Sequence, residues 1–249
     1  MLKKFTQTLR IDITPQALRL LRVSRWGSAA PEVLAEQALD GDMAEALEAL
    51  LAGHELSGWP VCIVLADELV RLWQVAPPAQ ASRLADLEGA AALRFNVLYG
   101  DSPAAWEISA GWSTTQPFLA AAVPRALKAQ LEQVCAARGL TVTAICPHFV
   151  AAWNRHAGAI RQGAWFGVVQ DKVLALAAIE GGQLKAVRHL PIPHGADHYW
   201  LTQMAQREAL VLDLQAPTLI QLCGELPAAL AKPAASDTQI ATAPLGVAA

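Results

Sequence analysis

Three histidines near one another are the first residues whose types could bind a metal. His189, His194 and His198 lie in one short segment, and Asp197 adds a carboxylate beside them. Zinc sites draw on imidazole and carboxylate ligands, so these residue types are suitable. The Pro-Ile-Pro-His-Gly run between them is typical of a solvated loop that leads into a helix. We therefore expect surface histidines and no metal site.

Asp12 is the second residue with a possible chemical role, because it lies at the end of an apolar strand. A carboxylate at that place could face a nucleotide phosphate through a divalent ion; the alternative is a turn carboxylate. The sequence contains no P-loop, dinucleotide-binding fingerprint, nucleophile elbow or zinc-protease motif. No serine, cysteine or lysine has a base partner at a recognisable spacing, so a covalent mechanism is not indicated.

The composition excludes several classes of protein. The chain has 249 residues, of which 54% are hydrophobic and 16% charged, with a net charge of −3. Its longest apolar runs are too short for a membrane span, which needs about 18–20 residues, and no secretion signal is recognisable at the start. No basic run indicates a nucleic-acid partner. The four cysteines are far apart without a CxxC motif, so we expect reduced, buried thiols.

Hydrophobic periodicity predicts a β-meander, a helix and a returning strand in a first lobe at residues 1–76. The expected elements are strands at Leu9–Ile13, Leu18–Ser24 and Val33–Ala38, a helix at Met43–Ala52 capped by Asp40 or Asp42, a buried strand at Val61–Leu65 and its hairpin partner at Leu69–Val75. An Ala-Pro-Pro-Ala segment then interrupts the pattern and indicates a lobe boundary.

Two further lobes follow. Residues 77–146 are predicted to form a small inserted α+β lobe, with a helix capped by Ser82, strands at Trp106–Ala110 and Phe118–Val123, a helix that starts at Pro124 and a strand at Leu140–Ile145. Residues 147–231 are predicted to form a lobe with three successive strands, a helix and a final strand, which repeats the plan of the first lobe. Residues 232–249 are rich in Ala, Pro, Ser and Thr, and we expect a flexible tail.

This two-lobed α/β plan with a small insertion resembles the actin-like (ribonuclease H-like) fold of the actin-like ATPases. Within that superfamily the chain resembles the PilM/GspL group, the cytoplasmic assembly proteins of type IV pili and type II secretion systems. The segment Ile11–Leu20 is similar to the Asp-x-Gly strand turn with which that group opens. Further similar segments are Gln74–Pro78, Phe118–Arg125 and Arg138–Pro147. The resemblance extends over about residues 9 to 230, and the order of elements carries it.

The departures from the active members lie in the nucleotide-binding loops. Thr14-Pro15 stands where the first phosphate loop has glycine, and proline also removes an N–H donor. The second phosphate loop is reduced to a short turn around Asp171, without glycine or hydroxyl, and the adenosine-side glycine pair is reduced to Gly224. The resemblance therefore implies vestigial nucleotide-binding positions at Asp12, Thr14, Asp171 and Gly224, with no cofactor.

The resemblance implies a non-catalytic scaffold that is cytoplasmic and peripheral at the inner membrane. Its partners would be an inner-membrane pilus or secretion protein, a secretion ATPase, or both. A PilM-like protein holds a partner segment in a groove between its first and second lobes, by adding a strand or burying apolar anchors. Trp73, Trp106 and Trp112 are the candidate anchors, because aromatic residues dominate binding hot spots.

Two alternatives remain open at the level of sequence. The chain could be a working ATPase that binds ATP with Mg²⁺ between Asp12 and Asp171. It could also be a sugar-kinase-like enzyme of the same superfamily, although no catalytic carboxylate in a suitable loop is recognisable.

Overall fold

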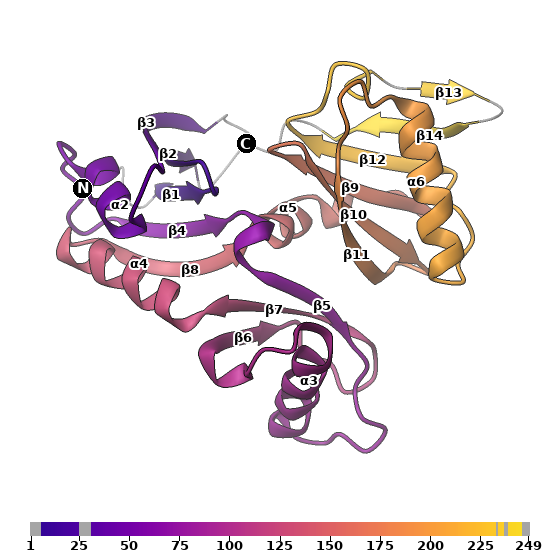
Figure 1. Cartoon of the computed structure of the whole chain (residues 1–249), viewed down its shortest axis with the longest axis horizontal. Helices are drawn as coiled ribbons and strands as arrows, with labels where there is room; N and C mark the ends of the chain where they lie inside the picture. The colour runs from indigo at the N-terminus through magenta and orange to yellow at the C-terminus, as the bar shows by residue number, and fades with distance from the viewer. Residues whose placement is uncertain (1–5, 25–30, 233, 237–238, 246–249) are drawn as a thin grey trace.

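The chain folds into three β-sheets with helices against them, as Figure 1 shows. This computed structural model describes residues 6–24, 31–232, 234–236 and 239–245. Sheet A has the strand order β3-β2-β1-β4-β8, sheet C the order β11-β10-β9-β12-β14-β13, and sheet B the order β5-β7-β6. Each sheet has its own hydrophobic core.

Sheet A forms the first lobe around a meander and two parallel strands. Its strands are β1 (Gln7–Ile13), β2 (Ala17–Ser24), β3 (Glu32–Ala38), β4 (Pro60–Leu65) and β8 (Thr141–Pro147). β1 and β2 pair antiparallel, as do β2 and β3, whereas β4 runs parallel to both β1 and β8. Alternate residues of β4 are fully buried, because α2 (Met43–Leu51) and α4 (Arg125–Ala137) contribute to the core on that side.

Sheet C repeats this plan in the last lobe. Its strands are β9 (Ala164–Gln170), β10 (Val173–Glu180), β11 (Gln183–Pro191), β12 (Leu219–Gly224), β13 (Ala234–Ser236) and β14 (Gln239–Pro244). β9, β10 and β11 form the antiparallel meander, and β12 returns parallel to β9. The lobe also contains α6 (His198–Val211), while α5 (His148–His156) follows β8 and leads into it. The predicted repetition of one plan in the first and last lobes is therefore present.

Sheet B and α3 (Leu84–Tyr99) form the inserted lobe. Its strands are β5 (Arg71–Val75), β6 (Trp106–Ala110) and β7 (Phe118–Pro124). Leu87, Ala91 and Phe95 recur every four residues and bury one face of α3 against the sheet. Short 3-10 helices are η1 (Asp67–Leu69), η2 (Pro103–Ala105) and η3 (Ala157–Ala159).

The limits of the lobes differ from the sequence-based limits of 76 and 146. β5 does not form a hairpin with β4; the chain turns through η1, and β5 pairs with β7 in sheet B. α4 packs on the core of sheet A, and β8 pairs with β4. The inserted lobe therefore begins at β5 and ends at β7, because strand pairing rather than the break at residues 76–79 decides which sheet a segment joins.

The tail expected at residues 232–249 contains two strands. β14 lies parallel to β12 and antiparallel to β13. Ile240 is 8% exposed, its N–H donates to Thr202 Oγ1 on α6 at 3.2 Å, and Thr242 is buried beside His198. Ile240 and Thr242 are two positions apart, so their side chains point to the same face of the strand and are buried there. This short alternation accompanies the addition of β14 to the sheet, although the segment has no longer alternation of apolar and polar residues.

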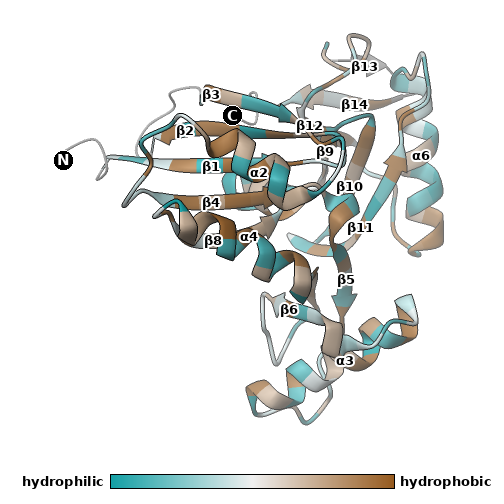
Figure 2. Ribbon diagram, turned by 60° about the vertical axis from the view of Figure 1, so that its left-hand side comes forward, coloured by the Kyte–Doolittle hydropathy of each residue, from teal (hydrophilic) through white to brown (hydrophobic). Residues whose placement is uncertain are grey.

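The apolar residues are distributed between these cores. Figure 2 shows hydrophobic residues in brown along the strands of sheets A and C. Across the residues that the structure describes, no helix has the length and hydrophobicity to span a membrane.

The start of α2 gives a quantitative test of the fold. Asp42 caps this helix, and its Oδ1 accepts from the N–H groups of Ala44 at 2.8 Å and Glu45 at 3.2 Å. Asp42→Ala leaves these donors without their partner and should lower the free energy of unfolding by about 1 kcal/mol. Asp40→Ala, at an exposed position without such a bond, is the matched control in chemical denaturation. Equal effects of the two substitutions would contradict this assignment of the cap.

Candidate functional site

Residues of the first and last lobes face each other across a cleft that is lined by Asp67, His148, Asp171 and His189, among others. Of the positions that the resemblance relates to nucleotide binding, Asp12 and Thr14 lie at the end of β1 and just after it, and Asp171 and Gly224 lie in the β9–β10 turn and at the end of β12.

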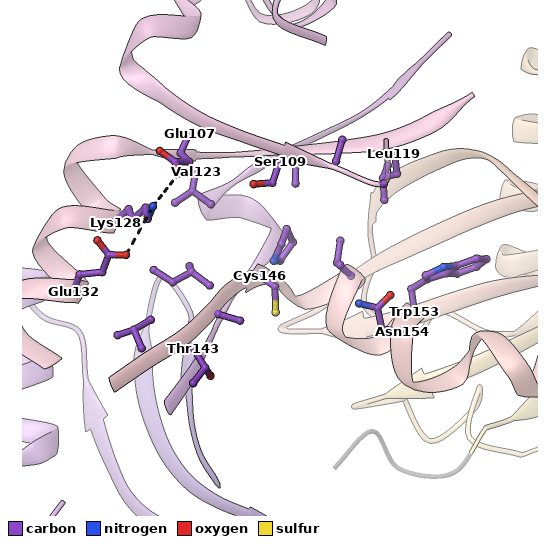
Figure 3. A pocket seen from close by; sticks show the side chains of 18 of the residues that line it. Glu107, Ser109, Leu119, Val123, Lys128, Glu132, Thr143, Cys146, Trp153 and Asn154 are labelled. Carbon is purple, nitrogen blue, oxygen red and sulfur yellow. Dashed lines mark hydrogen bonds and ion pairs between the residues drawn. The ribbon is translucent and has the colours of Figure 1, made fainter. Parts of the chain in front are cut away.

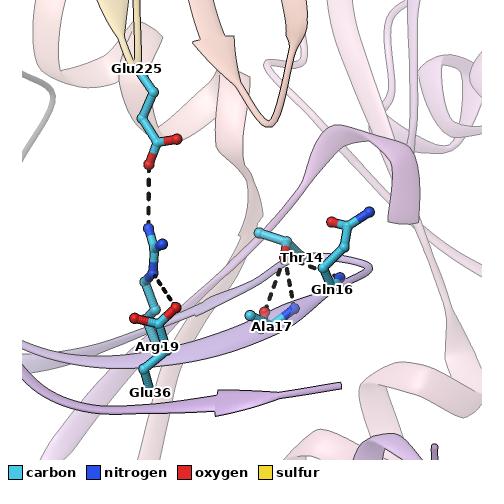
Figure 4. A network of polar contacts seen from close by, with 6 residues as sticks. All are labelled: Thr14, Gln16, Ala17, Arg19, Glu36 and Glu225. Carbon is cyan, nitrogen blue, oxygen red and sulfur yellow. Dashed lines mark hydrogen bonds and ion pairs between the residues drawn. The ribbon is translucent and has the colours of Figure 1, made fainter. Parts of the chain in front are cut away.

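In the β1–β2 turn, the Thr14 hydroxyl accepts from the N–H groups of Gln16 at 3.3 Å and Ala17 at 3.0 Å, as Figure 4 shows. It also lies 3.2 Å from the Ala17 carbonyl oxygen. The hydroxyl thus stabilises its own turn.

Asp12 lies on the same face of β1 as Arg10, and the two side chains form an ion pair in which Arg10 Nε donates to Asp12 Oδ1. Both side chains are 18% exposed. A carboxylate paired in this way has much of its charge compensated within the chain, which reduces its attraction for a divalent ion.

Asp171 lies at the tip of the β9–β10 hairpin. It has φ +46° and the next residue, Lys172, has φ +66°. Two consecutive left-handed residues are the conformation of a type I′ hairpin turn, which usually takes asparagine and glycine. The left-handed backbone conformation of the turn is therefore a sufficient reason for an aspartate at position 171, and no bound ligand is needed to explain it.

Gly224 is required by a close approach of the backbone. It has φ +94°, and a Cβ atom at this position would lie 2.1 Å from the carbonyl oxygen of Val169. The next residue, Glu225, donates its N–H to that same oxygen at 3.0 Å. Glycine is thus needed here to seat the end of β12 against β9.

An ion-pair network joins the two large lobes beside this point. Arg19 on β2 donates to Glu225 Oε1 at 3.3 Å and lies 3.3 Å from Glu36 on β3 (Figure 4). Arg19 and Glu225 are 47% and 65% exposed, so the pair contributes little stability by itself. The pair nevertheless brings side chains of both lobes into contact.

A small cavity of about 20 Å³ lies deeper in the cleft. Asp67 contributes to it from η1, His148 from the start of α5, Asp171 from the β9–β10 turn and His189 from β11. The Asp67 carboxylate has two contacts beside this cavity. Its Oδ1 accepts a hydrogen bond from the N–H of Phe149 at 3.0 Å, and its Oδ2 lies 3.3 Å from His189 Nε2. The space suffices for about one water molecule.

Burial lowers the pKa of His148, against the opposing effect of nearby carboxylates, chiefly Asp67. Neither Asp67 nor His148 is a site residue predicted from the sequence. Only the topology could have indicated them. Asp67 follows β4 and His148 follows β8, and the carboxyl ends of adjacent parallel strands meet at one edge of a sheet.

The histidines that suggested a metal have separate roles. His189 faces Asp67, His198 Nδ1 lies 3.2 Å from Thr242 Oγ1, and His194 is exposed. Asp197 caps α6 by accepting from the N–H of Trp200 at 2.9 Å. Within the described ranges, no group of three or more His, Cys, Asp or Glu residues is placed to hold a metal ion.

A larger groove lies between the inserted lobe and the first lobe, with a volume of about 680 Å³ (Figure 3). One wall is the face of sheet B opposite α3, with Leu119, Ala121 and Val123 on β7. The facing wall is β8, and α5 contributes Val150 and Trp153. These walls are mainly apolar, which is typical of a binding groove.

Charged residues form the rim of the groove near α4. Glu107 accepts from Lys128 at 2.9 Å and from Arg125 at 2.7 Å, and Lys128 lies 3.8 Å from Glu132. The bond from Lys128 lowers the pKa of Glu107, and the bond to Glu107 raises the pKa of Lys128. β8 and β6 are the terminal strands of their sheets, so each has one edge that pairs with no further strand of its sheet.

The three predicted tryptophan anchors lie in the inserted lobe's core region and not in the groove. Trp73 is 4% exposed, with its ring centroid 5.2 Å from that of Phe95, so its ring is not available as a surface anchor. Trp106 and Trp112 are half-buried against the same core. Trp153 is the tryptophan that lines the groove, and sequence analysis did not select it because a concave surface between lobes has no local pattern.

His148 gives a test of the cleft. Its lowered pKa means that the folded protein resists protonation at a pH where the unfolded chain accepts a proton. Its contribution to the free energy of unfolding is therefore complete above about pH 6.5 and is lost as the pH falls below that value. His148→Gln should reduce the fall in stability between pH 7 and pH 5, as measured by urea denaturation. His194→Gln is the control at an exposed position, and an identical pH dependence for all three proteins would refute the assignment.

No protein-family model matches the sequence, and no curated protein matches it. Solved structures do match. A Bacteroides thetaiotaomicron protein with an actin-like ATPase fold and unknown function is similar at a TM-score of 0.62 and 12% identity, over 91% of this chain and 85% of that one. The cytoplasmic domain of EpsL, an inner-membrane component of the type II secretion system of Vibrio cholerae, is similar at a TM-score of 0.61 and 16% identity, over 97% and 90% of the two chains.

A chain of the PilM–PilN type IV pilus biogenesis complex is also similar, at a TM-score of 0.61 and 16% identity, over 87% of this chain and 81% of that one. At such identities the likeness is one of fold. The fold expected from the resemblance is thereby confirmed: the chain has the actin-like ATPase fold, with a small α+β lobe inserted into its first half.

Proposed function

We propose that this chain is a non-catalytic actin-like scaffold of a type IV pilus or type II secretion assembly, located at the cytoplasmic face of the inner membrane. It holds a segment of an inner-membrane partner in the groove between the inserted lobe and the first lobe. The observation that carries this proposal is the groove itself, which has a volume of about 680 Å³ and mainly apolar walls. The fold similarity to EpsL and to the PilM–PilN complex supports the choice of system.

The chemistry of the groove favours an extended peptide with apolar side chains. Leu119, Val123 and Val150 provide apolar contacts, and the small side chain of Ala121 leaves space between them. The terminal strands β8 and β6 can add main-chain hydrogen bonds to such a segment. The ion-paired rim at Glu107 and Lys128 would orient its polar end.

The cleft supports the non-catalytic part of the proposal. Its inner cavity has a volume of about 20 Å³, and Asp67 and His189 of opposite lobes face each other there. The Asp12 carboxylate is paired with Arg10, and the Thr14 hydroxyl closes its own turn. Both side chains therefore already have partners within the chain, which competes with their use for phosphate or metal.

Substitution of Ala121 tests the groove. Ala121→Trp fills the space between the walls and should weaken binding of the partner segment at least about tenfold, since 1.4 kcal/mol corresponds to that factor. The probe is a synthetic peptide of PilN, which forms a complex with the structurally similar PilM, titrated by calorimetry. Leu93→Trp, at a 68% exposed position on α3, is the matched control. Equal affinities of the wild type and Ala121→Trp would contradict the location of the site.

Calorimetry with ATP tests the catalytic alternative. We expect no saturable heat with ATP and Mg²⁺ at millimolar concentration, and no ATP hydrolysis by the purified protein. An active ATPase that uses Asp12 and Asp171 predicts the opposite: tight binding that Asp12→Ala abolishes. Such binding would overturn the non-catalytic assignment and leave the groove proposal to be judged by the peptide titration.

A further inference from the structure

Two cysteines lie side by side on adjacent strands next to the groove. Cys62 on β4 is in register with Ala144 on β8, and Cys146 on β8 is in register with Val64 on β4. The two residues are therefore diagonal neighbours on one face of the sheet, where their thiols can interact. Both are half-buried, and Cys146 lines the groove, as Figure 3 shows. The sequence-based expectation of four buried thiols is thus wrong for this pair and correct for Cys135 and Cys223.

The surroundings of Cys62 favour a thiolate. The Cys146 thiol donates to the sulfur of Cys62, and Arg10 on β1 is in register directly beside Cys62. The hydrogen bond from Cys146 lowers the pKa of Cys62 to about 7, with a further contribution from Arg10, although burial and the Asp12 carboxylate oppose both. The same bond raises the pKa of Cys146. Burial raises the pKa of Cys135 to about 11 and that of Cys223 to about 12, so these two thiols are inert by comparison.

We propose that Cys62 and Cys146 form a redox-active dithiol beside the groove, which a low-molecular-weight disulfide such as glutathione disulfide oxidises. The Cys62 thiolate attacks one sulfur of the oxidant, so that a mixed disulfide forms on Cys62 and one glutathione thiolate leaves. The Cys146 sulfur then attacks Cys62 Sγ, releases the second glutathione and gives up its proton to it or to solvent. The two thiols lose two electrons, which reduce one glutathione disulfide to two glutathione molecules.

The second step requires a small movement of β8. The two strands lie about 4.8 Å apart and the two-residue offset adds about 6.6 Å along them, so the two Cα atoms are about 8 Å apart, whereas a disulfide spans at most about 7 Å. β8 can move because it is the terminal strand of sheet A, and its pairing with β4 has a register shift between Val61 and Cys62. Closure of the disulfide draws Cys146 toward β4 and thereby changes the wall of the groove.

Mass spectrometry tests the proposal on the full chain. The reduced protein is incubated with glutathione disulfide, and the free thiols are then blocked with iodoacetamide. We expect the wild type to lose two hydrogens and to give a Cys62–Cys146 cross-linked peptide, whereas Cys146→Ser accumulates one glutathione on Cys62. Cys223→Ala is the matched control and should form the same cross-link as the wild type.

The rate of alkylation gives a second readout. Iodoacetamide should label Cys62 with a pH midpoint near 7, and this midpoint should rise in Cys146→Ala, whose side chain has no hydrogen-bond donor. A wild type that stops at the glutathione adduct, or a Cys62 midpoint at the ordinary thiol value of about 8.5, would overturn the proposal. Should a Cys146 variant misfold by circular dichroism, the wild-type cross-link and midpoint still decide.

The effect on the groove rests on the proposed function and is measured separately. Reduced and oxidised protein are titrated with the partner peptide, and we expect the oxidised form to bind it more weakly. Absence of peptide binding by both forms would count against the proposed function alone, because the cross-link is read by mass without any partner.

Discussion

The parallel pairing of β4 with β8 is the contact on which the rest of the molecule depends. Between these two strands the chain leaves the first lobe through η1, builds sheet B and α3, and returns through α4. The pairing fixes both ends of the inserted lobe, so that the outer face of sheet B lies opposite the terminal strand β8. The groove follows from this arrangement, and so does the approach of Cys62 to Cys146. The same pairing aligns the carboxyl ends of β4 and β8, from which Asp67 and His148 reach the cleft.

Much of the fold could be predicted from sequence because its elements are local patterns. The alternation of β1, the continuous apolar run of β4 and the four-residue recurrence on α3 each depend on neighbouring residues only. Sheet membership is different. The sequence of β5 is equally suited to a hairpin with β4 or to pairing with β7, and the latter occurs because Trp73 and Val75 then contribute to the core of the inserted lobe. The assignment of α4 and β8 to the first lobe is a tertiary property of the same kind.

The candidate site was predictable to a smaller extent. Asp12 and Thr14 lie at the end of β1 and just after it, and Asp171 and Gly224 lie in the β9–β10 turn and at the end of β12, so the order of elements gave their places in the sheets. Their contacts could not be read from the sequence: Arg10 compensates Asp12, and Val169 dictates the glycine at 224. The preference of binding sites for aromatic residues predicted Trp73 as an anchor, but its side chain is buried in the core of the inserted lobe. A concave surface arises only when two lobes are placed against each other, so Trp153 carried no signal of its own.

The cleft and the groove differ in where their charged side chains lie. In the cleft, polar side chains of the two lobes contact one another, as in the ion pair of Arg19 with Glu225 and the contact of His189 with Asp67. These contacts join sheet A to sheet C while leaving little space between them. In the groove, the ion pairs remain on the rim, and the walls are apolar surface that is still in contact with water. Burial of such surface by a partner is favourable without any nucleotide chemistry, because removal of apolar area from water drives association. A chain of this composition can thus retain the actin-like frame and use the inserted lobe, rather than the cleft, as the place where free energy of binding is available.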